Sequence, residues 1–223
     1  MNRTKIEWTD FTWNPITGCL HGCWYCYAKR MFTRFGRSFE PTFHPERLEE
    51  PYALSEQPDT VKVFVCSVSD LFAPWTPAEW RDQVLTVGED PELSHIIFQL
   101  LTKQPHLIPL DHVFPENVWV GATVTHVDEI HKIDEIKRIE AGVRFVSFEP
   151  LLSNFPGVRL TGLDWIIIGK LTGSRRVKLD PAWVETLLEC AIIDGIPVFV
   201  KNNVNWLKKI QEFPSIFPKV KIE

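Results

Sequence analysis

Gly18-Cys19-Leu20-His21-Gly22-Cys23-Trp24-Tyr25-Cys26-Tyr27 places three cysteines in one short loop, with the spacing C-x3-C-x2-C. Three thiolates from such a loop can bind three irons of a 4Fe-4S cluster and leave the fourth iron open for another ligand. An iron with an open coordination position suits catalysis better than electron storage. The loop therefore predicts a cluster that is held by Cys19, Cys23 and Cys26 in a catalytic protein.

Zinc and disulfides are the other common roles of clustered cysteines. His21 lies between the first two cysteines, so a Cys3His zinc site is conceivable. Structural zinc usually takes its ligands in two separated pairs, and four ligands in one short loop would be cramped, so we interpret His21 as a polar loop residue. Disulfides are disfavoured because five cysteines is an odd number and a chain of 223 residues has ample core without them.

Length and composition are those of an ordinary globular protein. The 223 residues are 44% hydrophobic and 24% charged. No apolar run approaches the ~20 residues that a membrane helix needs, so no membrane partner is expected. We expect a single domain over residues 1–223. A cytoplasmic location is predicted, because no export signal is visible near Met1 and a thiolate-bound cluster suits a reducing compartment.

The formal net charge of −5 predicts no general affinity for nucleic acid. Two groups of basic residues stand out locally: Lys29, Arg30, Arg34 and Arg37 after the cysteine loop, and Arg175, Arg176 and Lys178 further on. Such side chains can contact phosphate, but we interpret both groups as solvated surface, which is their commoner role.

Six apolar runs have the near-continuous hydrophobicity of buried parallel strands. They cover residues 61–66, 95–101, 118–124, 143–148, 164–169 and 197–201. The segment 12–17, just before the cysteine loop, is a seventh candidate.

Helical segments fall between these runs. Thr76-Pro77-Ala78-Glu79 reads as a capping box before a helix that closes at Gly88. Further helices are expected over 27–35, over 127–141 with isoleucine at every third position, and from Asp180-Pro181 onward. Alternating strands and helices predict an α/β fold, and we expect an incomplete TIM-like (β/α)6–7 barrel with parallel strands and helices outside.

Polar side chains follow the predicted strands. Chemistry in a barrel gathers at the C-terminal ends of its strands. The polar residues at these ends include Ser67, Ser69, Asp70, Thr102, Lys103, Ser147, Glu149, Lys170 and Lys201. Because so many strand ends are polar in a chain that also carries the cysteine loop, they predict one site at that end of the barrel.

The cysteine loop resembles that of the radical S-adenosylmethionine (SAM) superfamily. The resemblance implies that SAM chelates the open iron and that an electron from the cluster cleaves SAM to a 5′-deoxyadenosyl radical, which removes hydrogen from a substrate. Glu7-Trp8-Thr9-Asp10, Ser67 to Phe72 and Ser147 to Leu152 further resemble a radical SAM family often encoded in bacteriophages and mobile elements (DUF5131-like). That family's Gly-Gly-Glu-Ser-Gly-like segment reads Gly169-Lys170-Leu171-Thr172-Gly173 here, which removes a carboxylate and adds a lysine.

The resemblance also implies residues that bind SAM. Tyr25, directly before the third cysteine, is similar to the aromatic residue near the SAM adenine, or packs on the barrel rim. Ser67, Ser69 and Asp70 stand, by position only, where the superfamily carries a Gly-Gly-Glu segment that receives the methionine ammonium group. Asp70 could equally cap the following turn.

Ser147 and Glu149 alternate on one strand, so both can point into the barrel mouth. A buried glutamate needs a partner. The SAM ribose or ammonium group would provide one, and so would a lysine at a neighbouring strand end. Thr102 contacts the cofactor or satisfies backbone groups.

Other candidates for catalysis are Cys66, Lys103, Lys170 and Lys201. Cys66 could donate a hydrogen atom to a substrate radical, or could be a small buried apolar residue, as most free cysteines are. The lysines could bind substrate anions or neutralise Glu149 and Asp70.

The sequence thus predicts a radical SAM enzyme that cleaves SAM and acts on an unknown substrate. The open side of a small barrel could admit a macromolecule. A ferredoxin or flavodoxin is the electron donor that the superfamily implies. The alternative is a non-catalytic Fe-S or zinc-binding module on the same fold.

Overall fold

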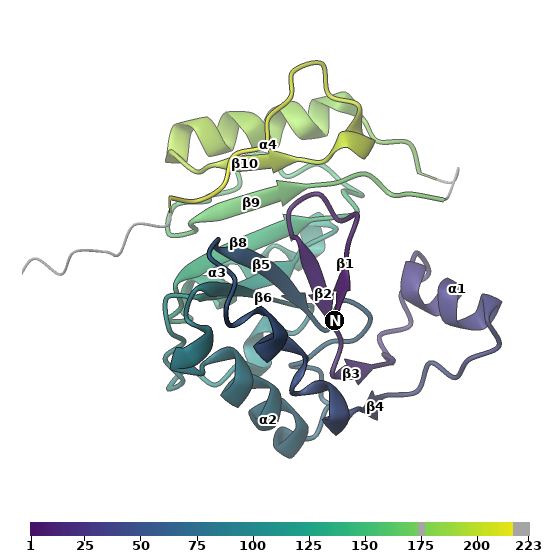
Figure 1. Cartoon of the computed structure of the whole chain (residues 1–223). Coiled ribbons are helices and arrows are strands. Elements are labelled where there is room, and N and C mark those ends of the chain that lie inside the picture. The colour runs from purple at the N-terminus through teal and green to yellow at the C-terminus, as the bar shows by residue number, and fades with distance from the viewer. Residues whose placement is uncertain (174–176, 216–223) are drawn as a thin grey trace, which may run out of the picture.

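An eight-stranded sheet that curls without closing organises the protein (Figure 1). The computed structural model describes residues 1–173 and 177–215, so Arg175 and Arg176 lie outside it. In sheet order the strands are β1 (Asn2–Arg3), β2 (Phe11–Trp13), β5 (Val61–Val65), β6 (Ile96–Thr102), β7 (Val118–Thr123), β8 (Val143–Phe148), β9 (Trp165–Ile168) and β10 (Val198–Val200). All neighbours pair in parallel except β1, which is antiparallel to β2. The predicted incomplete TIM-like barrel is therefore confirmed.

The gap between the two edges of the sheet is bridged by side chains. Glu7, in the loop between β1 and β2, accepts hydrogen bonds at Oε2 from the backbone N–H of Asn202 (2.7 Å) and from Gln211 Nε2 (3.3 Å). Both donors belong to the segment that follows β10. One carboxylate thus connects the N-terminal edge to the C-terminal edge, between which the described residues form no ladder of backbone hydrogen bonds.

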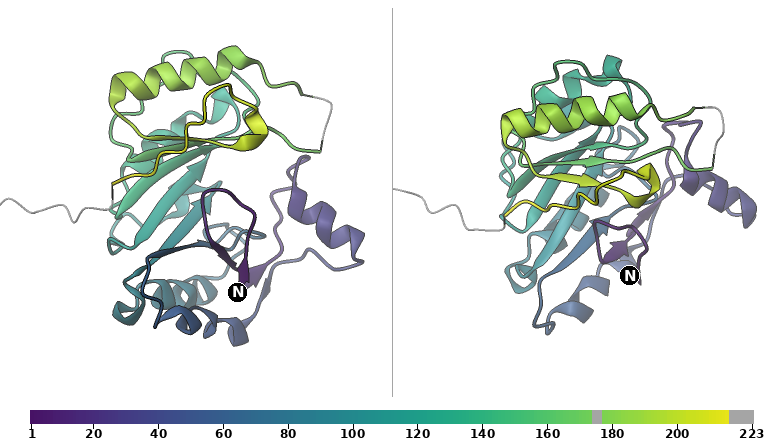
Figure 2. Two further views of the ribbon diagram at one scale, coloured as in Figure 1. Left: turned by 45° about the horizontal axis from the view of Figure 1, so that its top comes forward. Right: turned by 90° about the horizontal axis from the view of Figure 1, so that it is seen from above.

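Three helices cover the outer face of the sheet and a fourth stands apart (Figures 1 and 2). They are α2 (Ala78–Gly88), α3 (His131–Lys137) and α4 (Pro181–Asp194), with α1 (Tyr27–Arg34) as the fourth. Asp180 caps α4 as predicted, because its side chain accepts from the N–H of Ala182. None of the helices that the structure describes is long and apolar enough to cross a membrane.

Two predicted helix starts differ from the structure. Pro77 is the N-cap of α2 without a side-chain hydrogen bond, and the Thr76 hydroxyl donates instead to the carbonyl of Asp70. The predicted helix over 127–141 is divided into a 3-10 turn, Val127–Glu129, and the shorter α3. The real capping box lies here, between His126 and Glu129, where a polar side chain precedes the turn.

The predicted strand over 12–17 is also wrong in one respect. It is divided at Asn14-Pro15 into β2 and a separate strand, β3 (Ile16–Thr17), which pairs antiparallel with β4 (Thr42–Phe43). Proline cannot donate to a ladder, so the chain leaves the main sheet at this point. The small β3–β4 sheet thereby carries the cysteine loop and α1 away from the barrel wall.

Large aromatic side chains fill the inside of the sheet. Trp8, Trp119, Phe145, Trp165 and Phe199 form one buried cluster with neighbouring aliphatic residues. Space for them depends on Gly121 of β7, since an added Cβ there would lie 2.5 Å from the Phe145 ring. Each such ring contributes about 1.5–3 kcal/mol by burial. This filled layer forms the floor beneath the C-terminal ends of the strands.

Candidate functional site

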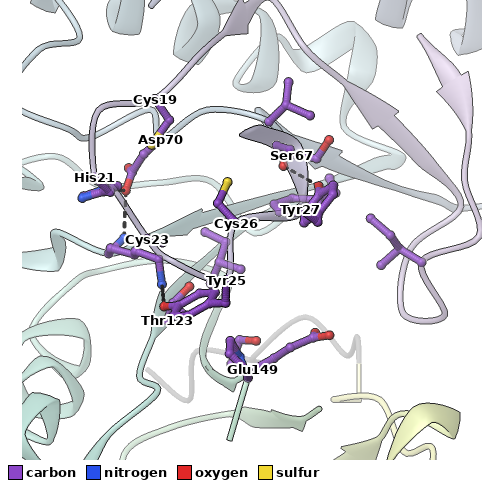
Figure 3. Close-up of a pocket in the computed structure, with 18 of the residues that line it drawn as sticks. Cys19, His21, Cys23, Tyr25, Cys26, Tyr27, Ser67, Asp70, Thr123 and Glu149 are labelled. Carbon is purple, nitrogen blue, oxygen red and sulfur yellow. Dashed lines mark hydrogen bonds and ion pairs between the residues drawn. The ribbon is translucent and has the colours of Figure 1, made fainter. Parts of the chain in front are cut away.

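The cysteine loop lies between β3 and α1, above the C-terminal ends of the strands (Figure 3). Gly18 begins it with φ +85°, and an added Cβ there would lie 2.1 Å from the carbonyl oxygen of Glu40, so only glycine fits. A turn closes with a hydrogen bond from the N–H of Cys26 to the carbonyl of Cys23 (3.0 Å). Cys26 then caps α1, because its Sγ accepts from the N–H of Lys29 (3.3 Å).

The segment after β5, Ser67 to Asp70, holds this loop in place. Gly18 donates its N–H to the Val68 carbonyl (3.2 Å) and accepts from the Ser69 hydroxyl (2.8 Å). Tyr27 donates its hydroxyl to the Ser67 carbonyl (2.6 Å), and burial raises the pKa of this phenol to about 12. The segment thus contacts both ends of the cysteine loop.

Asp70 is the most fully bonded member of the segment. Its Oδ1 accepts from the N–H of Phe72 (3.1 Å) and the hydroxyl of Thr102 (2.7 Å). Its Oδ2 accepts from the N–H of Lys103 (2.9 Å) and lies 2.7 Å from Nε2 of His21. The bond to Phe72 is the turn-capping role that was one of the two expectations for Asp70. Both oxygens have protein partners, so the carboxylate joins the loop to the barrel, and its expected contact with the SAM ammonium group stays a prediction.

A cavity of about 390 Å³ opens between the cysteine loop and the strand ends. Its size is that of pockets that bind small organic molecules. All predicted site residues except Cys66 line it: Cys19, Cys23, Tyr25, Cys26, Ser67, Ser69, Asp70, Thr102, Lys103, Ser147, Glu149, Lys170 and Lys201. The structure therefore brings together residues from five strand ends and the loop at one place.

Cys66 is not part of the cavity wall. Its side chain is 3% exposed and packs in the core between the sheet and the outer helices. Burial raises the pKa of its thiol to about 12. The structure thus favours the small, buried apolar role over hydrogen-atom donation to a bound substrate.

Tyr25 and Lys103 form a pair on one wall. The Lys103 ammonium donates to the Tyr25 hydroxyl (3.0 Å) and lies 5.4 Å from the centre of its ring. Burial raises the pKa of the Tyr25 phenol, so Tyr25 stays neutral and accepts from the charged lysine. Lys103 thus holds the Tyr25 ring in the cavity wall, directly before Cys26 in the sequence.

Glu149, which is labelled in Figure 3, forms an ion pair with Lys201, and both residues line the cavity. A lysine at a neighbouring strand end was one expected partner of Glu149, and of the three candidate lysines Lys201 makes this contact. Gly169 makes room for the carboxylate, because an added Cβ would lie 2.6 Å from Glu149 Cδ. Ser147 and Lys170 line the same side, and among the described residues no hydrogen bond reaches the Ser147 hydroxyl or the Lys170 ammonium.

Apolar residues that were not predicted from the sequence form another part of the wall. Ile6, Trp8, Phe64 and Leu101 line the cavity next to the aromatic floor. Trp8 is 2% exposed and its indole Nε1 has no hydrogen-bond partner among the described residues. Trp8 could have been recognised as a site residue, because it belongs to the Glu7-Trp8-Thr9-Asp10 motif. No sequence pattern, however, indicated that this motif would lie at the strand ends.

Cys19, Cys23 and Cys26 offer the three thiol donors that a 4Fe-4S cluster would take. In the part of the chain that the structure describes, no three His, Cys, Asp or Glu side chains converge on one ion position. Zinc needs thiolates roughly 3.8 Å apart to make bonds of about 2.3 Å, whereas cluster thiolates bind different irons and lie further apart. His21 is also engaged by Asp70 and packs edge-on against Trp75. The thiols of Cys19, Cys23 and Cys26 are free and line one cavity.

Burial affects the thiol of Cys19. Desolvation raises the pKa of Cys19 to about 11, with further contributions from the charges of Asp70 and the neighbouring cysteines. Metal coordination removes the thiol proton, so binding of iron would offset this effect.

Comparisons with known proteins address the family and the fold. The family described as "Protein of unknown function (DUF5131)" matches residues 3–215. No curated protein matches the chain. Among solved structures, the fold is similar to that of a spore photoproduct lyase double mutant with bound AdoMet and dinucleoside spore photoproduct. The TM-score is 0.61 at 11% identity, over 89% of this chain and 78% of that chain.

Proposed function

We propose that this chain, which belongs to the DUF5131 family, is a radical SAM enzyme. Cys19, Cys23 and Cys26 would hold three irons of a 4Fe-4S cluster, and the cavity would hold SAM against the fourth. When bound and reduced by one electron from a ferredoxin or flavodoxin, the cluster would cleave SAM into methionine and a 5′-deoxyadenosyl radical that abstracts hydrogen from the substrate.

One observation carries the proposal: the three thiols of the C-x3-C-x2-C loop line a single cavity at the C-terminal ends of the parallel strands. Strand ends are where barrels of this kind carry out chemistry. The similar fold of the spore photoproduct lyase structure, which holds AdoMet and a dinucleoside, supports a cavity of this type as a place for SAM.

The chain's own residues would position SAM in three ways. The Tyr25 ring, fixed by Lys103, offers an aromatic face for adenine, and Trp8 offers an indole N–H without a partner among the described residues. Glu149 and Ser147 offer oxygens for ribose hydroxyls or the ammonium group. The apolar wall of Ile6, Phe64 and Leu101 would exclude water from a reactive radical.

The test is anaerobic reconstitution with iron and sulfide, followed by dithionite and SAM. About four irons per chain, an EPR signal of a reduced cubane cluster and release of 5′-deoxyadenosine are expected. Cys19→Ala, Cys23→Ala and Cys26→Ala should each abolish all three results. Cys190→Ala is the matched control, because Cys190 lies on α4 outside the cavity wall.

Two results would refute the proposal. Purified protein that retains zinc and takes up no iron would indicate the zinc-binding module instead. A reconstituted cluster that never yields 5′-deoxyadenosine would leave an Fe-S module without SAM chemistry.

A further inference from the structure

The cysteine loop and α1 form an electropositive region on an acidic protein. Residues 11–39 contain four basic side chains and no carboxylate, so they carry +4 while the remaining residues carry −9. Lys29, Arg30, Arg34 and Arg37 are all exposed and make no ion pair within the described ranges. Such uncompensated local charge attracts an anion even when the whole protein repels one.

Apolar side chains are exposed at the same place. Trp24 is 54% and Phe35 66% exposed, and Ala28 is the only buried residue of α1. Figures 1 and 2 show α1, which lies between Trp24 and Phe35 in the sequence, standing clear of the sheet. Single exposed apolar residues are common, but proteins that bind single strands combine positive charge with aromatic rings on which bases stack.

A line of cations leads from this helix to the cavity. An added Cβ at Gly173 would lie 3.5 Å from Arg30 Nη2, so the Arg30 guanidinium rests beside the loop that follows β9. The same loop carries Lys170, Leu171 and Thr172, which line the cavity. The Lys170 ammonium is unpaired within the described part of the chain. An anion bound along α1 can therefore continue past Arg30 to Lys170.

We infer that the α1 patch, defined as Trp24, Lys29, Arg30, Arg34, Phe35 and Arg37, binds single-stranded nucleic acid and directs one nucleotide toward the cavity. The inference rests on the proposed function and deepens it by naming the substrate class. Arginine guanidinium groups match phosphate oxygens, and exposed rings stack on unpaired bases. A flexible strand can reach Lys170 inside the cavity, whereas a folded acidic protein would rest on α1 alone.

Binding is tested by fluorescence anisotropy of labelled 20-nucleotide single strands, one of DNA and one of RNA, with the full reconstituted chain over a range of salt. Each lost phosphate contact lowers the slope of log K against log salt by about 0.7. Arg34→Gln/Arg37→Gln should therefore lower it by about 1.4 and weaken binding at least tenfold. Phe35→Ala should weaken binding roughly tenfold through lost stacking.

Arg138→Gln/Arg159→Gln is the matched control. Both residues are exposed, and they lie on segments that lead into β8 and β9, at the end of the sheet opposite the cavity. This variant loses the same charge, so it should bind the strands as the unmodified chain does. An equal loss of oligonucleotide affinity in both double variants would show that only the net charge matters. That result would overturn the inference.

Lys170→Gln distinguishes a nucleic acid from an acidic protein partner. A strand that enters the cavity loses a further contact, so the slope falls by about another 0.7. The inference would be overturned if neither oligonucleotide bound and Arg34→Gln/Arg37→Gln lost SAM cleavage with flavodoxin but kept it with dithionite. The α1 patch would then be the binding site of a reductase.

Failure of the inference and failure of the proposed function give different results. SAM cleavage without oligonucleotide binding refutes the inference alone. Salt-dependent binding that responds to the patch variants, in a chain that never releases 5′-deoxyadenosine, refutes the enzyme and with it the assignment of nucleic acid as its substrate.

Discussion

Asp70 Oδ2 lies 2.7 Å from Nε2 of His21, and this contact joins the end of β5 to the middle of the cysteine loop. The same carboxylate accepts from Thr102 and Lys103 at the end of β6. The position of the loop therefore depends on two strands of the barrel through one buried side chain, which is 3% exposed.

Asp70→Asn should loosen the cysteine loop. The amide keeps one acceptor oxygen but turns an N–H toward donors, so the unfolding free energy should fall by about 2–3 kcal/mol. Iron content after reconstitution should fall with it. Urea denaturation and iron analysis measure the two effects. Asp134→Asn, whose side chain is 85% exposed, is the control and should change neither. Unchanged iron content in Asp70→Asn would show that the loop does not depend on this contact.

Gly18→Ala should displace the loop more severely. The new Cβ would lie 2.1 Å from a backbone oxygen of Glu40, so the main chain must move. We expect a loss of more than about 3 kcal/mol and no stable cluster. Gly22→Ala is matched, because Gly22 also has positive φ but open space around its Cβ. Gly22→Ala should lower the unfolding free energy by only about 1–2 kcal/mol, because alanine disfavours the left-handed conformation. Equal melting temperatures for the two variants would contradict the steric argument.

Glu129 should contribute stability that depends on pH. Burial alone would raise its pKa, but hydrogen bonds from Lys132 and Thr125 outweigh burial and lower the pKa to about 2. A lowered pKa stabilises the folded state above the unfolded value of about 4.5, and this stability is lost as the pH falls toward 2.

Glu129→Gln should therefore lower the unfolding free energy at pH 7 by about 1–2 kcal/mol, after allowance for solvent screening. The difference from the unmodified chain should shrink between about pH 4.5 and pH 3. Urea denaturation at several pH values measures it. A difference that stays constant over this range would mean that Glu129 acts through packing rather than charge.

The strand ladder and the site's location could be predicted from the sequence because they depend on local patterns. Runs such as 143–148 are mostly apolar, and parallel strands place their C-terminal ends at one edge of the sheet whatever the loops do. Observed and predicted bounds of this strand agree. The helix after Asp180 was equally readable, since a capping aspartate precedes a proline.

Side-chain pairing could not be predicted in the same way, because it joins residues far apart in sequence. Thr76 resembled an N-cap, yet its hydroxyl bonds to the carbonyl of Asp70. The contact between the Ser69 hydroxyl and the Gly18 carbonyl was not predicted either, and the expected role of Ser69 in cofactor binding stays a prediction. From the sequence, Lys103, Lys170 and Lys201 were equal candidates for the ion-pair partner of Glu149. In the folded chain Lys201 is the partner.

The Glu149–Lys201 pair offers a test that separates structure from cofactor binding. Lys201→Met leaves a half-buried carboxylate unpaired, so it should lower the unfolding free energy by about 1–3 kcal/mol. Glu149→Gln/Lys201→Met removes both charges and should recover most of this loss. If Glu149 also contacts SAM, the double variant should still bind SAM about tenfold more weakly, as measured by equilibrium dialysis with reconstituted protein.

Gly169→Ala approaches the same question from the backbone. The new Cβ would lie 2.6 Å from Glu149 Cδ and displace the carboxylate without changing any charge. We expect Gly169→Ala to bind SAM as weakly as Glu149→Gln/Lys201→Met does, although it keeps both residues of the ion pair. Gly88→Ala, where the nearest atom would be 3.7 Å away, is the control and should bind SAM normally. Full SAM affinity in Gly169→Ala would confine Glu149 to a structural role beside Lys201.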